Sequence, residues 1–270
     1  SLPKIVVAVH LAGLSCEMHE LHKLKMEFGF HIIEDASHAL GATYLDTKVG
    51  SCKYSDISVF SFHPVKIITT GEGGAITTNC EDLARKIRLL RNHGITKNKL
   101  DFEQESDGEW YYEQNALGFN YRMSDIQAAL GLSQLQHLDN YISLRKTQAS
   151  RYNDLLADTD LSLPAISERS ASSWHLYIIR LSNQSSKNEH RRVFTSLRAR
   201  GINVALHYIP VYRHPYYRKL NINWMSQFDG AERYYSSAIS LPIFPSLHVD
   251  QLEYVAQALI QSVESKDIKP

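Results

Sequence analysis

The sequence lacks the features that mark membrane-spanning and nucleic-acid-binding proteins. No apolar stretch approaches the roughly 20 residues that span a bilayer, and no long basic run is present. Lys and Arg together number 29, as do Asp and Glu, so the formal net charge at pH 7 is zero. A chain without a basic stretch lacks the usual signal for nucleic acid or an anionic membrane surface. We therefore expect a globular protein that binds neither.

Cysteine is scarce, with only Cys16, Cys52 and Cys80 in the chain. An odd number of cysteines without metal-ligand spacing indicates reduced thiols rather than a disulfide framework, so we expect a cytoplasmic protein. The thirteen histidines include no pair at metal-binding spacing on one helix face. The sequence therefore predicts no metal site.

Apolar runs and helical patterns alternate in the first half of the chain. Runs rich in β-branched residues at 4–10 and 30–35 predict strands on either side of a helix that Gly29 ends. Two further strands are expected at 56–62 and 74–79. Strand, helix and strand in this order form a βαβ unit with a right-handed crossover. The sheet should therefore be mostly parallel, with the run at 4–10 buried in it.

The pattern changes further along the chain. A helix is predicted over 80–94, with Asn79 as its N-cap, and a polar arm follows at 96–115. Strands then become fewer and are expected at 172–181 and 202–210, between amphipathic helices. This change indicates a small α+β domain after the first α/β domain.

Four polar side chains follow the ends of two predicted strands. Asp35 ends the strand FHIIED, Ser61 and His63 follow DISVF, and Lys66 stands between that strand and the glycines of GEGG. In open α/β sheets, ligands bind beyond the carboxyl ends of the strands. Pyridoxal phosphate (PLP) needs an aspartate for its pyridine nitrogen and a lysine for a Schiff base and proton transfer. A hydroxyl such as that of Ser61 can bind the cofactor's phosphate.

Each of these residues also has a structural interpretation. Asp35 could cap the following turn, and Lys66 could be a surface charge. The glycines of GEGG could form an ordinary hairpin loop. Spacing alone leaves these alternatives open.

Six separated motifs occur in a fixed order along nearly the whole chain. They are EDASHALGATY, SFHPVKIITTGEGGAITTN, RLLRNHGI, GFNYRMSDIQAALGLSQL, LHYIPVY and ISLPIFPSL. Together they resemble the DegT/DnrJ/EryC1/StrS family of PLP-dependent sugar aminotransferases, which have fold type I. HPVKIITTGEGG and HYIPVY followed by PYYRKL are most similar to the transaminases of pseudaminic acid biosynthesis, a nucleotide-sugar pathway.

The resemblance implies an α/β fold of PLP fold type I. Residues 1–138 would form a partial PLP-binding large domain with a mostly parallel sheet, and residues 139–270 a small C-terminal α+β domain. The activity implied is transamination of a UDP-4-keto-6-deoxy-N-acetylhexosamine, with L-glutamate as the amino donor. The partners implied are the nucleotide sugar, L-glutamate and a second copy of the chain.

The resemblance also implies a role for individual residues in the cofactor site. Lys66 would be the catalytic, Schiff-base lysine, and Asp35 would bind the pyridine nitrogen. His38 would lie against the cofactor ring, and Ser61 would bind the phosphate. Asn120, in GFNYR, would reach the phosphate of the neighbouring subunit's cofactor, so the active site would be shared within a homodimer.

Substrate contacts are implied for four further residues. His63 would shape the pocket or contact the sugar nucleotide, and Arg122, His207 and Tyr208 would contact the donor or the nucleotide sugar. Two of these have open alternatives, because Arg122 could serve only as an ion-pair partner and Tyr208 could serve only in packing.

The family begins with a further segment that the present sequence does not contain. That segment carries a phosphate-binding turn at a helix N-terminus, which is a major part of an anion site. A truncated, non-catalytic homologue is therefore one alternative to an active transaminase. A second alternative is an aminotransferase of the same family that acts on a different nucleotide sugar.

Overall fold

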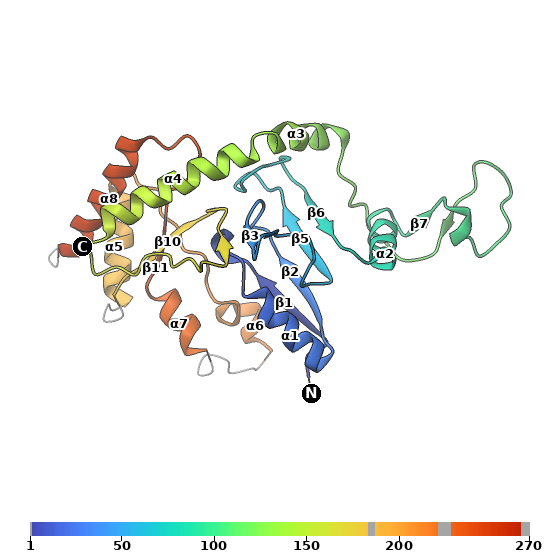
Figure 1. Ribbon diagram of the computed structural model, residues 1–270, viewed down its shortest axis with the longest axis horizontal. Helices are drawn as coiled ribbons and strands as arrows, with labels where there is room; N and C mark the ends of the chain where they lie inside the picture. The colour runs from blue at the N-terminus through green and yellow to red at the C-terminus, as the bar shows by residue number, and fades with distance from the viewer. Residues whose placement is uncertain (1, 183–186, 221–227, 266–270) are drawn as a thin grey trace. The chain divides into compact units, whose positions relative to one another are not determined.

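Figure 1 shows a computed structural model of the chain, which describes residues 2–182, 187–220 and 228–265. The chain divides into two compact units. The first comprises Ser1–Leu11 and Ser15–Leu138, and the second comprises Ala12–Leu14 and Asp139–Pro270. Within the described residues, no helix has the length and apolar character that crossing a membrane requires.

The first unit is built on a four-stranded sheet in the order β1-β2-β5-β6. Its strands are β1 (Ile5–Val9), β2 (His31–Asp35), β5 (Ile57–Ser61) and β6 (Gly74–Thr77). β1, β2 and β5 are parallel and β6 is antiparallel to β5, which confirms the mostly parallel sheet predicted from the sequence. The helix α1 (Met18–Phe28) connects β1 to β2 and ends at Gly29, which has a φ of 73°.

β1 differs from the buried strand predicted at 4–10. Ile5, Val7 and Val9 are about half exposed, at 54, 56 and 49%. Ala8, on the opposite face, is buried in a cluster with Phe30 and other apolar side chains of this unit. β1 is therefore apolar on both faces, and within the described residues only the face of Ala8 is covered, by side chains such as Met18 of α1.

Shorter elements complete the first unit. They are β3 (Thr43–Tyr44), β4 (Thr47–Lys48), α2 (Glu81–Arg91), β7 (Ile95–Thr96), η2 (Lys99–Asp101), β8 (Glu113–Gln114) and α3 (Asp125–Leu135). The predicted N-cap of α2 is wrong, because Cys80 holds that position and Asn79 donates its amide to the carbonyl oxygens of Ser51 (2.9 Å) and Cys52 (3.3 Å). α3 begins with a capping box between Ser124 and Gln127.

The second unit has its own apolar core. Its elements are α4 (Leu138–Leu156), β9 (Ser170–Ala171), β10 (Tyr177–Arg180), α5 (Lys187–Ala199), η3 (Val211–Arg213), α6 (Pro215–Arg218), α7 (Asp229–Tyr235), β11 (Ala238–Leu241) and α8 (Val249–Glu264). β10 and β11 are antiparallel, and α4, α5 and α8 contribute to one buried cluster with them. Tyr152, Tyr177 and Leu259 are fully buried in that cluster.

The strands predicted in the second unit are longer than those observed. In the range 172–181 only β10 is a strand, and at 202–210 a single bridge joins Ala205 to Ser240. The chain does not continue this bridge as a strand, because the carbonyl oxygen of His207 accepts a hydrogen bond from the Tyr234 hydroxyl (2.9 Å). The Tyr234 hydroxyl therefore makes the hydrogen bond that a neighbouring strand would otherwise make to this carbonyl oxygen.

Two glycines with similar backbone angles provide a matched test of the first unit. Gly94 has a φ of +72° and an added Cβ would lie 1.8 Å from the carbonyl oxygen of Ala116, whereas Gly29 has a φ of +73° and nothing within 4 Å. We predict that Gly29→Ala costs about 1 kcal/mol of left-handed strain, and that Gly94→Ala costs about 1–3 kcal/mol more because the backbone must move. Urea unfolding compares the two variants, and equal destabilisation would contradict the prediction.

Candidate active site

Asp35 lies in the middle of the sheet at the end of β2. Its backbone pairs with Val9 of β1 and Val59 of β5, and its carbonyl oxygen accepts a hydrogen bond from the His10 backbone N–H (3.0 Å). The Oδ1 atom accepts hydrogen bonds from the Ser37 N–H (3.1 Å) and hydroxyl (2.6 Å). The Oδ2 atom has no hydrogen-bond partner within the described ranges. Ser37 thus fixes the orientation of the Asp35 carboxylate, and Oδ2 remains able to accept a hydrogen bond.

Lys66 is held by the turn between β5 and β6. Its backbone N–H donates to the carbonyl oxygen of His63 (2.9 Å), and the next residues, Ile67 and Ile68, are buried at 5 and 3% exposure. Burial lowers the pKa of Lys66 below its usual 10.5, while the negative charge of Asp35 acts in the opposite direction. The two side chains are therefore close enough to interact electrostatically.

Ser61 and His63 follow the end of β5. The hydroxyl oxygen of Ser61 accepts a hydrogen bond from the His63 backbone N–H (3.4 Å), and its own proton has no acceptor in the described part of the chain. The His63 ring accepts at Nδ1 from the Val65 N–H (3.3 Å) and lies 3.8 Å from the Glu72 carboxylate through Nε2. His38 is buried at 7% exposure in the turn after β2. The segment that leads to Lys66 thus carries a hydroxyl able to donate and an exposed imidazole.

The other predicted site residues form two separate groups. Asn120 and Arg122 lie near the end of α2, where Asn120 bridges Asn92 and the Arg122 guanidinium donates to the Asn92 side-chain oxygen (2.6 Å). Both are exposed. In the second unit, His207 Nδ1 is 2.7 Å from the Ser240 hydroxyl, and Tyr208 stands edge-on to the His207 ring with 53% of its surface exposed.

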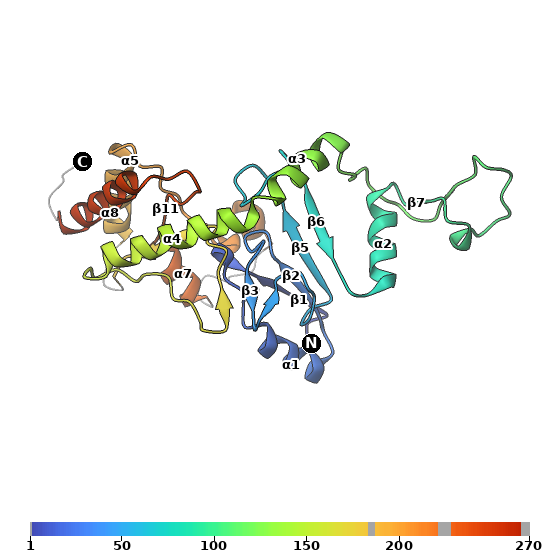
Figure 2. The ribbon, with the colours of Figure 1, turned by 45° about the horizontal axis from the view of Figure 1, so that its top comes forward.

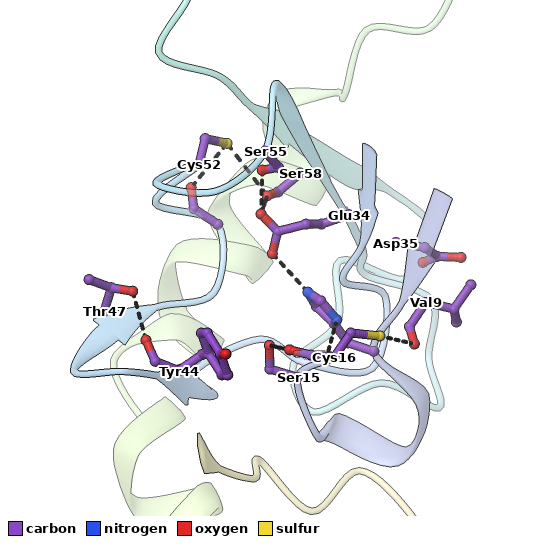
Figure 3. Close-up of polar contacts among 12 residues, drawn as sticks. Val9, Ser15, Cys16, Glu34, Asp35, Tyr44, Thr47, Cys52, Ser55 and Ser58 are labelled. Carbon is purple, nitrogen blue, oxygen red and sulfur yellow. Dashed lines mark hydrogen bonds and ion pairs between the residues drawn. The ribbon is translucent and has the colours of Figure 1, made fainter. Parts of the chain in front are cut away.

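A buried charge pair under the sheet was not predicted from the sequence. Figure 3 shows Glu34 with Ser55 and Ser58, and Glu34 Oε1 accepts from both hydroxyls, at 2.9 Å from Ser58. Glu34 Oε2 lies 2.7 Å from Nε2 of His10, and both side chains are almost fully buried. The available signal was a glutamate inside the apolar run HIIED and a histidine at the end of the preceding strand.

The surroundings of the pair shift its two pKa values in opposite directions, upward for His10 and downward for Glu34. Burial disfavours the charged form of His10, but its contacts with Cys16 and Glu34 outweigh burial and raise the pKa of His10 to about 9. The backbone N–H of Cys16 donates to Nδ1 (3.2 Å), and only a neutral ring can accept it, so this one contact favours the neutral form, whereas the Cys16 side chain and Glu34 favour the protonated form. Burial likewise opposes ionisation of Glu34, and its hydrogen bonds still lower the pKa of that carboxyl. The Glu34 carboxylate therefore accepts a hydrogen bond from Nε2 of His10 in either state of the ring.

The model of the DegT/DnrJ/EryC1/StrS aminotransferase family matches residues 2–260. The chain belongs to this family. Members of the family depend on PLP, and the solved structures similar to this chain include a PMP-form and a PLP-form of one protein. The sequence resemblance and the fold class drawn from it are thereby confirmed.

Three relatives illustrate the similarity. The UDP-4-amino-4,6-dideoxy-N-acetyl-beta-L-altrosamine transaminase of Campylobacter jejuni is 38% identical over 260 residues, which cover 96% of this chain. The structure of Helicobacter pylori PseC, an aminotransferase involved in the biosynthesis of pseudoaminic acid, has a TM-score of 0.86 and 35% identity, over 96% of this chain. Spr1654 from Streptococcus pneumoniae in its PMP-form has a TM-score of 0.87 and 29% identity, over 97% of this chain.

The chain spans about two thirds of the length of these relatives. The match covers 65% of the Campylobacter transaminase, 66% of PseC and 69% of Spr1654. Both units contribute to the match, because the family model extends from β1 into α8. The comparison with these relatives therefore applies to both units of the chain.

The His10–Glu34 pair predicts a pH-dependent stability. A pKa raised from 6.5 to about 9 on folding contributes stability that is fully present below pH 6.5 and is lost as the pH rises through about 9. The free energy of unfolding should thus fall by up to about 1.4 kcal/mol per pH unit across this window. Urea unfolding at several pH values measures this. His10→Gln, which can still donate to Glu34 but does not titrate, should flatten the profile; an unchanged slope would contradict the assignment.

The electrostatic interaction between Asp35 and Lys66 predicts that the pKa of Lys66 changes when Asp35 loses its charge. Asp35→Asn removes the charge that opposes burial, so the pKa of Lys66 should fall further below 10.5. Competitive acylation across a pH series, with Lys66 followed by mass spectrometry, measures that pKa. Asp82→Asn, an exposed carboxylate on α2, is the matched control. A pKa of Lys66 that stays constant or rises in Asp35→Asn would exclude the interaction.

Proposed function

We propose that this chain carries the catalytic core of a PLP-dependent sugar-nucleotide aminotransferase. The reaction would transfer the amino group of L-glutamate to a UDP-4-keto-6-deoxy-N-acetylhexosamine, as in pseudaminic acid biosynthesis. One observation carries the proposal: the Lys66 amine, the Asp35 Oδ2 atom and the Ser61 hydroxyl proton have no hydrogen-bond partner within the described residues, and all three lie at or just after neighbouring strand ends. The names of the Campylobacter and Helicobacter relatives support the choice of sugar.

The three groups have the chemistry that PLP requires. When bound, PLP supplies an electron sink for the carbon that loses or gains a proton. Asp35 Oδ2 would accept a hydrogen bond from the protonated pyridine nitrogen and so keep that nitrogen positively charged. The Ser61 hydroxyl would donate to a phosphate oxygen, and buried His38 would lie against the ring. For Asp35 and Ser61, the assigned atoms are ones that have no hydrogen-bond partner within the described residues.

Lys66 would move the proton. Burial favours the neutral amine, and a neutral amine can accept a proton near neutral pH more readily than an ordinary lysine can. The Asp35 carboxylate limits this shift, because it favours the protonated form. Burial and the Asp35 charge thus act on the pKa of the Lys66 amine in opposite directions, which suits a group that must both accept and return a proton.

Exposed and half-buried side chains would contact the substrates. His63 and Arg122 in the first unit, and His207 and Tyr208 in the second, supply hydrogen-bond donors and a cation of the kind that carboxylates and diphosphates require. Asn120 is exposed and would reach the cofactor phosphate of a second copy, so the proposal includes a homodimer with shared active sites. The cytoplasmic location stays a prediction.

The proposal predicts a covalent site for PLP. With added PLP, an absorption band should appear that borohydride fixes, and peptide mapping should locate the label on Lys66. Lys66→Ala should lose the label and about 10²–10⁴-fold of the transamination rate. Lys4→Ala, at an exposed lysine of the same unit, should retain both.

A label on another lysine, or a rate that survives Lys66→Ala, would refute the mechanism. A folded protein that takes up no label would instead favour the non-catalytic homologue. Activity restricted to another keto sugar would retain the mechanism and change the substrate. A panel of 4-keto and 3-keto nucleotide sugars distinguishes this last case.

A further inference from the structure

The turn that carries Lys66 is closed at its base by hydrogen bonds. The Phe62 N–H donates to the carbonyl oxygen of Gly73 (2.8 Å), and the Thr70 N–H donates to that of Phe62 (3.0 Å). The Thr69 hydroxyl donates to the same Phe62 oxygen (3.0 Å). Figures 1 and 2 show α3 next to this connection between β5 and β6. Lys66 therefore lies within a closed turn that is adjacent to a helix.

Thr70 occupies a space that two glycines leave open. It is buried at 3% exposure, and its hydroxyl donates to the carbonyl oxygen of Glu72 (2.8 Å). An added Cβ on Gly73 would lie 2.3 Å from Oγ1 of Thr70, and one on Gly131 of α3 would lie 2.7 Å from its Cγ2. The hydroxyl of Thr70 therefore faces the turn, and its methyl group faces α3.

A second contact joins α3 to the same carbonyl oxygen. The side-chain amide of Gln127 donates from Nε2 to the Glu72 carbonyl oxygen (2.9 Å). Its Oε1 atom accepts hydrogen bonds from the backbone N–H (2.9 Å) and the hydroxyl (3.0 Å) of Ser124, the N-cap of α3. Both ends of the Gln127 amide are therefore held. The Glu72 oxygen receives one hydrogen bond from within the turn and one from the helix.

These contacts restrict a segment whose glycines would otherwise leave it free to move. Gly71 and Gly73 are exposed, and only the α3 contacts and the buried Ile67 and Ile68 fix the described backbone around them to other parts of the first unit. Burial lowers the pKa of Lys66 and the charge of Asp35 raises it. Both effects depend on where the turn holds the amine.

We propose that Thr70 and Gln127 are positioning residues for Lys66. They bind the Glu72 carbonyl oxygen together and so hold the turn in the place that keeps the lysine partly buried. This inference rests on the proposed function, in which Lys66 carries PLP and moves the proton. Neither positioning residue touches the reacting atoms, because each acts through the backbone of the turn.

The test measures the pKa of Lys66 in the full chain without PLP, by competitive acylation across a pH series followed by mass spectrometry. Thr70→Val keeps the shape of the side chain and removes its hydroxyl, and Gln127→Met keeps the length and removes the amide. Burial has the larger effect on this pKa, so a turn that admits water should raise it by about half a pH unit or more toward 10.5. Asp35→Asn should then lower the pKa less in each variant than in the unaltered chain.

Two control variants remove similar contacts without releasing the turn. Thr47→Val removes a hydroxyl that donates to the carbonyl oxygen of Tyr44 (2.8 Å), between β3 and β4. Ser124→Ala removes one contact of the Gln127 side chain and keeps the hydrogen bond from Gln127 to Glu72. The pKa of Lys66 should be the same in both controls as in the unaltered chain.

An exchange of size between Thr70 and Gly131 gives an independent check. Gly131→Ala adds a methyl group that would collide with Cγ2 of Thr70, and alanine is a better helix former than glycine, so α3 itself is not weakened. This variant should raise the pKa of Lys66 as Thr70→Val does. Adding Thr70→Ser removes the colliding methyl group and keeps the hydroxyl, so the double variant should restore the original pKa.

An unchanged pKa of Lys66 in either Thr70→Val or Gln127→Met would overturn the proposal. A shift of the same size in either control would also do so, because it would reflect a general loosening of the first unit. A double variant that restores nothing would contradict the contact between Thr70 and α3. Since the measurement uses no PLP, it is independent of the proposed function: PLP labelling of a different lysine would refute that function and leave the positioning result unchanged.

Discussion

The parallel register of β1, β2 and β5 is the constraint on which the candidate active site depends. Asp35 is paired on one side with Val9 and on the other with Val59, so its backbone cannot move without breaking two ladders. Parallel strands end at one edge of the sheet, and the same register brings Ser61 to that edge. The turn that contains Lys66 then connects β5 directly to the antiparallel β6. The three groups proposed to bind PLP therefore share one support.

The buried His10–Glu34 pair extends this support beneath the site. It joins the ends of β1 and β2, and the backbone N–H of His10 also donates to the carbonyl oxygen of Asp35. Removing one partner of a buried pair leaves an unpaired buried charge, which costs about 3–5 kcal/mol. The hydroxyls of Ser55 and Ser58 donate to the remaining oxygen of Glu34, so both carboxylate oxygens are hydrogen-bonded. Buried side chains at the ends of β1 and β2 thus help to fix the position of Asp35.

Local sequence patterns predicted where the strands of the first unit end, whereas the contacts between strands depend on their long-range register. The runs before Asp35 and Ser61 are continuous and apolar, so their ends are visible in the sequence. His10 and Glu34 lie 24 residues apart, and their contact depends on which residues of two strands face each other. The arm at 96–115 has no periodicity, so the pairing of β7 with β8 could not be foreseen. The run at 4–10 is apolar on both faces, so it was predicted to be buried; which face other parts of the chain cover depends on long-range packing that a local pattern does not show.

The protein uses cationic groups in two different physical settings. At Lys66, burial opposes the charge and Asp35 favours it, so a small change in surroundings alters the protonation state. On α2 the arginines are exposed, and burial does not oppose their charge. The first unit thus keeps the two kinds of cation on different elements, the β5–β6 turn and α2. Of the two, only the partly buried Lys66 has surroundings that shift its pKa toward the range a proton-transfer group needs, which is why the proposed mechanism assigns that role to it.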